Sequence, residues 1–164
     1  MYKPELATQA DVKEILALYR AATAAANSTG NSLWNDEYPS EETIRADLAG
    51  DYLYVWREGG KIVAAITLMH PYDLDGRGIE WTNAERAVEA CRFCLSPALQ
   101  GKGRAKAYFA GAIEKLRELG VQSMRYLCAK DNPAAYRVYT GMGHRVVGQT
   151  QWEGADYYAF EALL

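Results

Sequence analysis

The sequence lacks several features that would define a protein's class at once. Its 164 residues include only three cysteines and two histidines, and no apolar run approaches the length of a membrane-spanning helix. The N-terminus, MYKPELATQADVKEI, has no apolar segment typical of a secretion signal. An odd number of cysteines without such a signal argues against a disulfide framework. We therefore expect a cytoplasmic protein that does not associate with membranes.

The sequence has no excess of basic residues either. Lysine and arginine number 18 against 21 aspartates and glutamates, which gives a formal net charge of −3. This balance argues against general binding to nucleic acid and suits a small cationic partner better. No repeat or linker divides the chain, and its length suffices for one domain with a substantial core. We expect a single domain over residues 1–164.

One motif suggests metal or redox chemistry, the Cys-x-x-Cys formed by Cys91 and Cys94. In a strand, side chains three residues apart point to opposite faces, so the two thiols would converge only if the strand contained a bulge. No second Cys/His pair has zinc spacing, since His70 and His144 stand alone. We expect structural thiols and no bound metal.

What the sequence does contain is an alternation of helical and strand patterns. Strands are expected at 52–57, 61–69, 87–95, 122–128, 144–151 and 156–163, and helices after the capping pair Thr8/Asp11, from Ser40 to about Ala49, from Ala105 to Leu119, and from Pro133 after an Asn132 cap. Residues 70–86 are expected to form a loop. The order α-α-β-β-β-α-β-α-β-β predicts an α/β protein with a mixed sheet and helices on its faces.

The stretch LQGKGRAKAYF joins an expected strand to an expected helix. Gly101 and Gly103 permit close approach of the backbone to a ligand, and N–H groups at a helix start favour an anion. Lys102, Arg104 and Lys106 add positive charge. Neither the Walker A nor the dinucleotide glycine pattern is met, and two glycines alone fit an ordinary surface turn. A phosphate site outside those two families is the alternative.

Three segments together resemble a known family. QGKGRA (Gln100–Ala105) is similar to the Q/R-x-x-G-x-G/A motif of the GNAT N-acetyltransferases, and the preceding CRFCLSP resembles the end of that family's fourth strand. NPAAYRVYTGMGHRVVG, from Asn132 to Gly148, resembles N-x-x-A-x-x-x-Y-x-x-x-G-F-x-x-x-G. LWNDEYPSEETIRADL also looks like the region of the first two helices in bacterial members. The resemblance implies a GNAT-like fold, a twisted mixed sheet of about six to seven strands flanked by about four helices.

The resemblance also implies a co-substrate, acetyl-CoA, and residues that hold it. Backbone N–H groups of the glycine turn would hold the pyrophosphate, and the end of the fourth strand would pair with the pantetheine arm. Asn132 would contact the cofactor near its pantetheine, and Tyr139 would lie close to the thioester sulfur. The implied backbone contacts are Gln100, Gly101, Lys102, Gly103, Arg104 and Ala105 for the turn, and Phe93, Cys94 and Leu95 for the strand.

Acetyl transfer to an amine needs a base, because an alkylamine with a pKa of ~10.4 is protonated at neutral pH, and it is helped by an acid at the departing thiolate. Tyr139 is the candidate acid; the alternative is an ordinary core tyrosine. Some family members carry a glutamate where this sequence has Leu127. Glu89 is the first candidate base, because alternation would place it on the same face as Cys91 and Phe93 unless a bulge changed the parity.

Other sources of the base stay open. Glu80 and His70 are reserves, a water chain is another route, and a solvated surface carboxylate is the plain alternative for Glu89. Two positions depart from the family pattern: Cys91 stands where many relatives have His, and His144 replaces the usual Phe.

The acceptor pocket is expected from two aromatic and acidic clusters, which suit a cationic amine but are equally explained by packing. They are Trp34, Asp36 and Tyr38, and Tyr72, Asp73, Asp75 and Trp81. Together these features favour an N-acetyltransferase that acts on a primary amine of a small molecule or peptide by direct attack in a ternary complex. The alternative is a non-catalytic sensor of acyl-CoA. The oligomeric state stays open, with a homodimer as one alternative because dimers are common among similar proteins.

Overall fold

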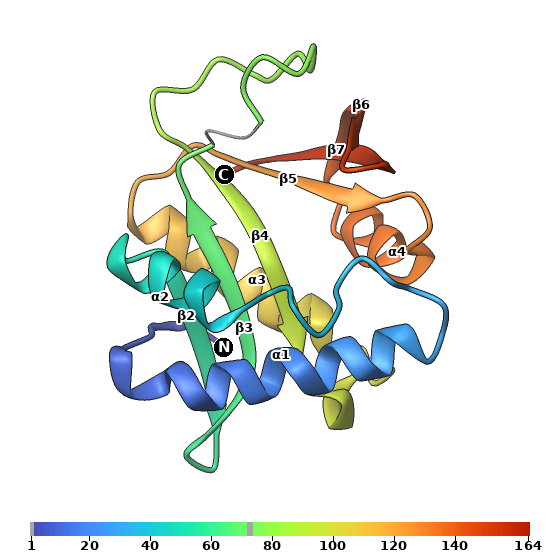
Figure 1. The fold of residues 1–164 in the computed structure, drawn as a ribbon. Coiled ribbons are helices and arrows are strands. Elements are labelled where there is room, and N and C mark those ends of the chain that lie inside the picture. The colour runs from blue at the N-terminus through green and yellow to red at the C-terminus, as the bar shows by residue number, and fades with distance from the viewer. Residues whose placement is uncertain (1, 72–73) are drawn as a thin grey trace.

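The computed structural model describes residues 2–71 and 74–164, in which seven strands form one sheet (Figure 1). The strand order is β1-β2-β3-β4-β5-β7-β6; only β4 and β5 are parallel neighbours. The elements are β1 (Glu5–Leu6), α1 (Val12–Asn27), α2 (Glu41–Ala49), β2 (Leu53–Glu58), β3 (Lys61–Met69), β4 (Ala87–Leu95), α3 (Arg104–Glu118), β5 (Ser123–Ala129), α4 (Pro133–Gly141), β6 (Arg145–Trp152) and β7 (Ala155–Leu163).

All the expected helices and strands are present, and capping side chains or a glycine mark several of the helix ends. The side chain of Ser40 accepts a hydrogen bond from the Thr43 N–H at the start of α2, and Asn132 caps α4 in the same way. Gly120, with φ of +72°, follows the end of α3. The structure adds the two-residue strand β1 and two short 3₁₀ helices, Gln9–Asp11 and Pro97–Leu99, which are too short to show a periodic pattern.

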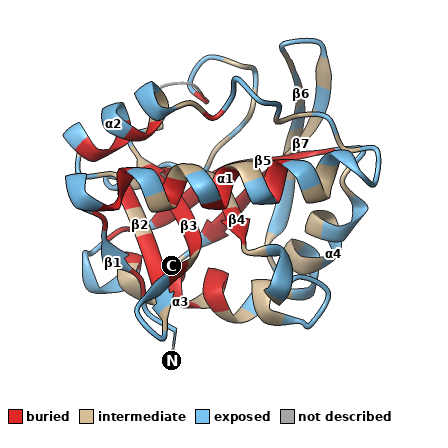
Figure 2. Ribbon diagram, turned by 60° about the horizontal axis from the view of Figure 1, so that its bottom comes forward, coloured by how far each residue is buried: buried red, intermediate tan, exposed pale blue. Residues whose placement is uncertain are grey.

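Two hydrophobic clusters cover opposite faces of the sheet. Helices α1 and α2 pack on one face through residues such as Tyr19 and Ile44, while α3 packs on the other through Phe109. The buried stripe of α1 and its exposed outer side are visible in Figure 2. Helix α4 lies on the α3 side, because Tyr139 contacts Phe109 and Tyr126. No helix of residues 2–71 and 74–164 is long and apolar enough to cross a membrane.

Strands β4 and β5 pair over only three register positions and then separate. The paired residues are Ala87 with Ser123, Val88 with Met124, and Glu89 with Arg125. Beyond them the two strands diverge (Figure 1). The second half of β4 therefore keeps a backbone edge that no strand of the sheet occupies, and we call this V-shaped opening the splay.

Strand β4 also contains a bulge. Its register with β3 shifts between Cys91 and Cys94, so that Arg92 and Phe93 together occupy one position. Arg92 has φ of +49°, in the left-handed region that residues with a Cβ rarely adopt. The bulge changes which side chains of β4 share a face.

Candidate active site

The glycine turn stands at the wide end of the splay, directly before α3. Gly101 and Gly103 both have φ of +70°, and Gly103 is the N-cap of a helix that no side chain caps. No described residue accepts a hydrogen bond from the backbone N–H groups of residues 101–103. Open N–H groups and the positive end of the helix dipole make this turn suited to an anion such as a pyrophosphate.

The basic side chains beside the turn have different partners. Arg104 donates to the Tyr2 hydroxyl at 2.5 Å and lies 3.5 Å from Glu58, and Lys106 donates to the Gly141 carbonyl at 3.1 Å. Lys102 is exposed and bonds no described residue. Of these three cations only Arg104 is paired with a carboxylate, so the positive charge beside the turn comes mainly from Lys102, Lys106 and the helix dipole.

The end of β4 places backbone and side chains in different surroundings. The Phe93 ring packs 5.1 Å from Phe109 on the α3 side, whereas Cys94 is buried in the cluster of α1. Gln100 donates from its amide to the Leu95 carbonyl at 3.0 Å and so braces the strand end against the turn. Burial raises the pKa of the Cys94 thiol well above its usual range, so this thiol stays neutral.

The two thiols of the Cys-x-x-Cys motif are free, and the bulge turns both toward α1 and α2. Cys91 is half-buried, with its Sγ 3.9 Å from the Met69 sulfur. No group of three or more His, Cys, Asp or Glu residues within 2–71 and 74–164 is arranged to hold a metal ion. The motif therefore shows no metal-site geometry in the described part of the chain.

Tyr139 projects from α4 into the aromatic cluster beneath the splay. Its ring centroid lies 4.6 Å from Tyr126, 5.0 Å from Phe109 and 5.6 Å from Phe160. Burial raises the pKa of Tyr139 well above its usual range, so the phenol stays protonated at neutral pH. A protonated hydroxyl can donate a hydrogen bond to a departing sulfur.

A part-buried hydrogen bond between Tyr126 and His144 supports this aromatic cluster. The Tyr126 hydroxyl and His144 Nδ1 lie 2.6 Å apart, and burial raises the pKa of Tyr126 while lowering that of His144. Both pKa shifts favour the neutral forms, so we assign a neutral imidazole whose Nδ1 accepts a hydrogen bond from the Tyr126 phenol. His144 thus holds the Tyr126 ring, against which Tyr139 packs.

Asn132 makes a structural contact at the start of α4. Its side-chain oxygen accepts from the Ala135 N–H at 3.1 Å and caps α4. The nearby Cys128 thiol is buried, and this desolvation raises its pKa to about 11. The cap fixes the start of the helix that carries Tyr139.

Glu89 lies on the sheet face opposite Tyr139. Only 8% of the residue is exposed, which rules out the interpretation of a solvated surface carboxylate. It shares this face with Cys91, as alternation predicts, but the expectation that Phe93 would share it is wrong because the bulge turns Phe93 toward α3. The reserve candidates Glu80 and His70 are exposed.

On the Glu89 side, a cavity of about 480 Å³ opens between the α1–α2 loop and the β6–β7 hairpin. Its lining residues are Ser32, Leu33, Lys130, Asp131, Glu153, Gly154, Ala155, Asp156 and Tyr157. None of Trp34, Tyr38 and Trp81, the residues predicted for the acceptor, is among them. The sequence predicts the Glu153–Asp156 segment only as a turn, and no local pattern links it to Ser32.

The predicted acceptor residues have other contacts. Trp34 packs edge-on against Tyr19 at 5.4 Å, and Asp36 is exposed. Tyr38 is 41% exposed and accepts a hydrogen bond of 3.1 Å from Arg92, whose guanidinium also pairs bidentately with Asp47. Arg92, at the bulge, thus holds the α1–α2 loop over the sheet.

The second predicted cluster belongs to the loop before β4. The Arg125 guanidinium lies 5.4 Å from the centre of the half-buried Trp81 ring. Asp75 is exposed, with its carboxylate 4.0 Å from Arg125. Tyr72 and Asp73 lie outside the described residues.

Comparison with known proteins gives one family. The family model described as "Acetyltransferase (GNAT) family" matches residues 13–144. No curated protein sequence matches the chain. The chain has the same fold as a GNAT-family acetyltransferase from Streptococcus agalactiae, with a TM-score of 0.83 and 20% identity over 99% of this chain and 95% of that one.

Two further structures are described with a ligand. The Salmonella typhimurium protein YncA, with its cofactor acetyl-CoA, has a TM-score of 0.69 and 20% identity over 100% of this chain and 94% of that one. PaiA N-acetyltransferase from Thermoplasma acidophilum, in complex with coenzyme A, has a TM-score of 0.72 and 13% identity over 100% and 99% of the two chains. At these identities the likeness shows a shared fold.

Proposed function

Since this chain belongs to the GNAT acetyltransferase family, we propose that it transfers the acetyl group of acetyl-CoA to a primary amine of a small molecule or peptide. The attack is direct, within a ternary complex of protein, acetyl-CoA and amine. The observation that carries the proposal is the pairing of two features, a splay between β4 and β5 and an uncapped helix start at its wide end.

The cofactor half of the site is supported by the open backbone groups. The N–H groups from Gly101 to Ala105 would hold the pyrophosphate, whereas the Gln100 N–H already donates to the Pro97 carbonyl at 3.2 Å. The edge of Phe93, Cys94 and Leu95 that faces the splay would pair with the pantetheine arm as an added strand does. YncA and PaiA are described with acetyl-CoA and coenzyme A, which fits this assignment.

The reacting amine would approach from the face of Glu89, which we assign as the base that receives the ammonium proton, directly or through water. On the other face, Tyr139 would donate a hydrogen bond to the departing sulfur. Complete proton transfer from its phenol to a thiolate with a pKa of ~8.5 would be uphill, so the hydroxyl acts by stabilising the developing charge.

The direct test separates turnover from binding. The protein is mixed with acetyl-CoA and a panel of primary amines that includes amino acids, polyamines, aminoglycosides and peptides, and free thiol is titrated over time. We expect acetyl-CoA to bind in calorimetry and at least one amine to release thiol. Cofactor binding without thiol release for any amine would instead support an acyl-CoA sensor, and absence of binding would contradict both functions.

A further inference from the structure

The loop that joins β3 to β4 is long, and the longer of its two described stretches, residues 74–86, is anchored to the sheet at several points. The Arg77 guanidinium lies 3.4 Å from the centre of the Trp152 ring. Ile79 packs closely against Gly148, since a Cβ on that glycine would lie 3.3 Å from the Ile79 side chain. Loops of this length without secondary structure are uncommon in compact domains, where they are usually either functional or linker segments. The contacts to the sheet favour a functional loop here. We call residues 74–86 the strap.

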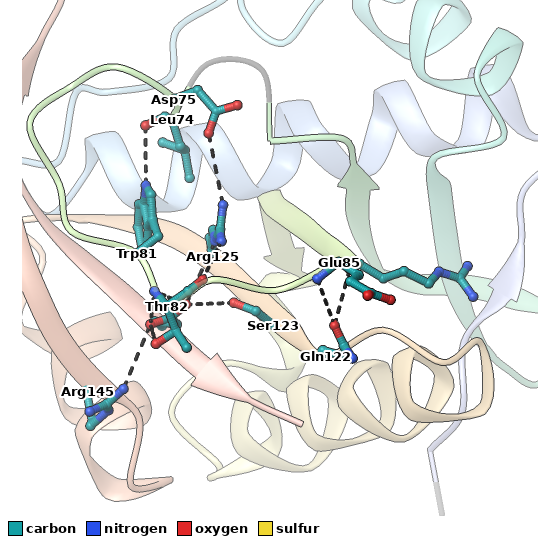
Figure 3. Close-up of polar contacts among 11 residues, drawn as sticks. Leu74, Asp75, Trp81, Thr82, Glu85, Gln122, Ser123, Arg125 and Arg145 are labelled. Carbon is teal, nitrogen blue, oxygen red and sulfur yellow. Dashed lines mark hydrogen bonds and ion pairs between the residues drawn. The ribbon is translucent and has the colours of Figure 1, made fainter.

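One further bond lies within the strap, and another attaches its C-terminal end. The Trp81 indole donates to the Leu74 carbonyl at 3.3 Å, and the Glu85 N–H donates to the Gln122 side chain at 2.9 Å (Figure 3). The strap is therefore a fixed wall in this structure.

Its central attachment is the buried carboxylate of Glu161 in β7, whose side chain is 0% exposed. Thr82 donates to it twice, from its backbone N–H at 3.2 Å and from its hydroxyl at 2.9 Å. Ser123 of β5 donates from its hydroxyl at 2.8 Å. Arg125 and Arg145 each place a guanidinium nitrogen 3.8 Å from the carboxylate.

Arg125 connects this hydrogen-bonded group around Glu161 to the candidate reaction centre. This residue stands beside Glu89 in the β4–β5 register, at the last paired position before the splay opens. Its guanidinium donates to the Thr82 carbonyl at 2.9 Å and lies against the Trp81 ring (Figure 3). Glu161, Thr82 and Arg125 thus connect the strap to the position next to the proposed base.

We propose that Thr82 and Glu161 are positioning residues that hold the strap as the wall of the acceptor side, so that Trp81 and Arg125 are fixed beside Glu89. This inference rests on the proposed acetyl transfer and adds the residues that determine acceptor binding. Neither Thr82 nor Glu161 belongs to the glycine turn or the end of β4, so the positioning acts on the amine and leaves acetyl-CoA binding unchanged.

The chain offers a matched pair of variants to test this role. Thr82→Val and Ser123→Ala each remove one hydroxyl that donates to the Glu161 carboxylate. The two lost hydrogen bonds have similar lengths, 2.9 and 2.8 Å. Of these two hydroxyls, only that of Thr82 joins the strap to the sheet, since Ser123 and Glu161 both belong to strands. A purely stabilising role predicts equal effects, whereas a positioning role predicts different ones.

The experiment has three readouts on the full chain. Acetyl-CoA affinity is measured by calorimetry, hydrogen exchange by mass spectrometry of peptides from 74–86, and KM and kcat with the amine of the screening panel that is turned over fastest. For Thr82→Val we expect exchange in the strap to accelerate at least fivefold and the amine KM to rise about tenfold, with acetyl-CoA affinity unchanged.

Thr82→Ser, which keeps the hydroxyl, and Ser123→Ala should both retain the wild-type amine KM and strap exchange. Unchanged strap exchange in Thr82→Val, or an equal rise of the amine KM in Ser123→Ala, would overturn the proposal. Failure of the wild-type protein to bind acetyl-CoA would contradict the acetyltransferase function itself, and the exchange comparison would still decide whether Thr82 holds the strap.

Discussion

Burial sets the protonation state of the side chains beneath the splay. Tyr139 and Tyr126 are held neutral because their phenolates would lose hydration, and His144 is held neutral for the same reason. Three neutral polar groups in an aromatic cluster give a hydrogen-bond donor near the expected sulfur without a fixed charge.

The role of Tyr139 is tested by removing only its hydroxyl. Tyr139→Phe should lower kcat about 10²-fold, within the usual range for a lost acid, while acetyl-CoA affinity changes little because the ring stays packed. Steady-state kinetics with calorimetry measures both. Tyr136→Phe, on the same helix with its ring against Tyr158, serves as the control. Wild-type turnover in Tyr139→Phe would remove the hydroxyl from the mechanism.

His144 should make stability depend on pH in a defined window. Its pKa in the folded state lies below the ordinary value of about 6.5, so as pH falls the unfolded chain binds the proton first and stability decreases from about pH 6.5 downward. His144→Phe, which supplies the residue usual in similar sequences, should lack this loss. Urea unfolding at pH 7.5 and pH 5.5 compares the two proteins; an equal loss in both would show that another group titrates.

At the scale of elements, local sequence patterns determined most of the fold. The Ser40 cap, the Asn132–Pro133 helix start and the Gly120 stop are short-range signals, and each marks a helix end in the structure. The prediction that Phe93 shares a face of β4 with Glu89 was wrong because β4 contains a bulge at Arg92. That bulge depends on the pairing with β3 and on the ion pair with Asp47, which are distant in sequence.

The glycine turn is an element whose role can be tested by backbone strain. Gly103 and Gly60 both have positive φ and open space where a Cβ would stand, with no atom within 4 Å, so alanine costs each a similar amount, about 1 kcal/mol. Gly103→Ala should also weaken acetyl-CoA binding about tenfold, because the N–H groups of the turn must meet the pyrophosphate closely. Calorimetry on both variants checks this; equal acetyl-CoA affinities would contradict the phosphate role of the turn.

The two halves of the candidate site differ in how far sequence could predict them. Most of the cofactor half is contiguous, since the turn and the end of β4 lie within residues 93–105, and only Asn132 and Tyr139 come from the start and the body of α4. The proposed acceptor half joins Trp81 and Thr82 of the strap to Glu89, Arg125 and Glu161 of three different strands, which no local pattern links. Likewise, the sequence around Glu161 indicates only a strand residue, and the folded chain alone brings Thr82 to it.

For the whole molecule, ligand binding and stability are linked. If acetyl-CoA binds the native state alone, a concentration 100 times its Kd adds about 2.7 kcal/mol to the free energy of unfolding. For a domain of this size such a gain corresponds to a rise in Tm of about 5–10 °C. Thermal unfolding with and without acetyl-CoA measures the shift. Gly103→Ala should show a smaller shift at the same ligand concentration; an unchanged wild-type Tm would contradict binding.

The short pairing between β4 and β5 also has a mechanical consequence. Strands β1 to β4 form one continuously hydrogen-bonded part of the sheet, and strands β5 to β7 form another. The two parts are joined within the sheet only by the three paired positions of β4 and β5. A ligand bound in the splay would contact both parts of the sheet and join them a second time. The stiffness of the sheet should therefore rise as the fraction of ligand-bound protein rises. The stiffness of the whole sheet would therefore report what fraction of the molecules hold a ligand in the splay.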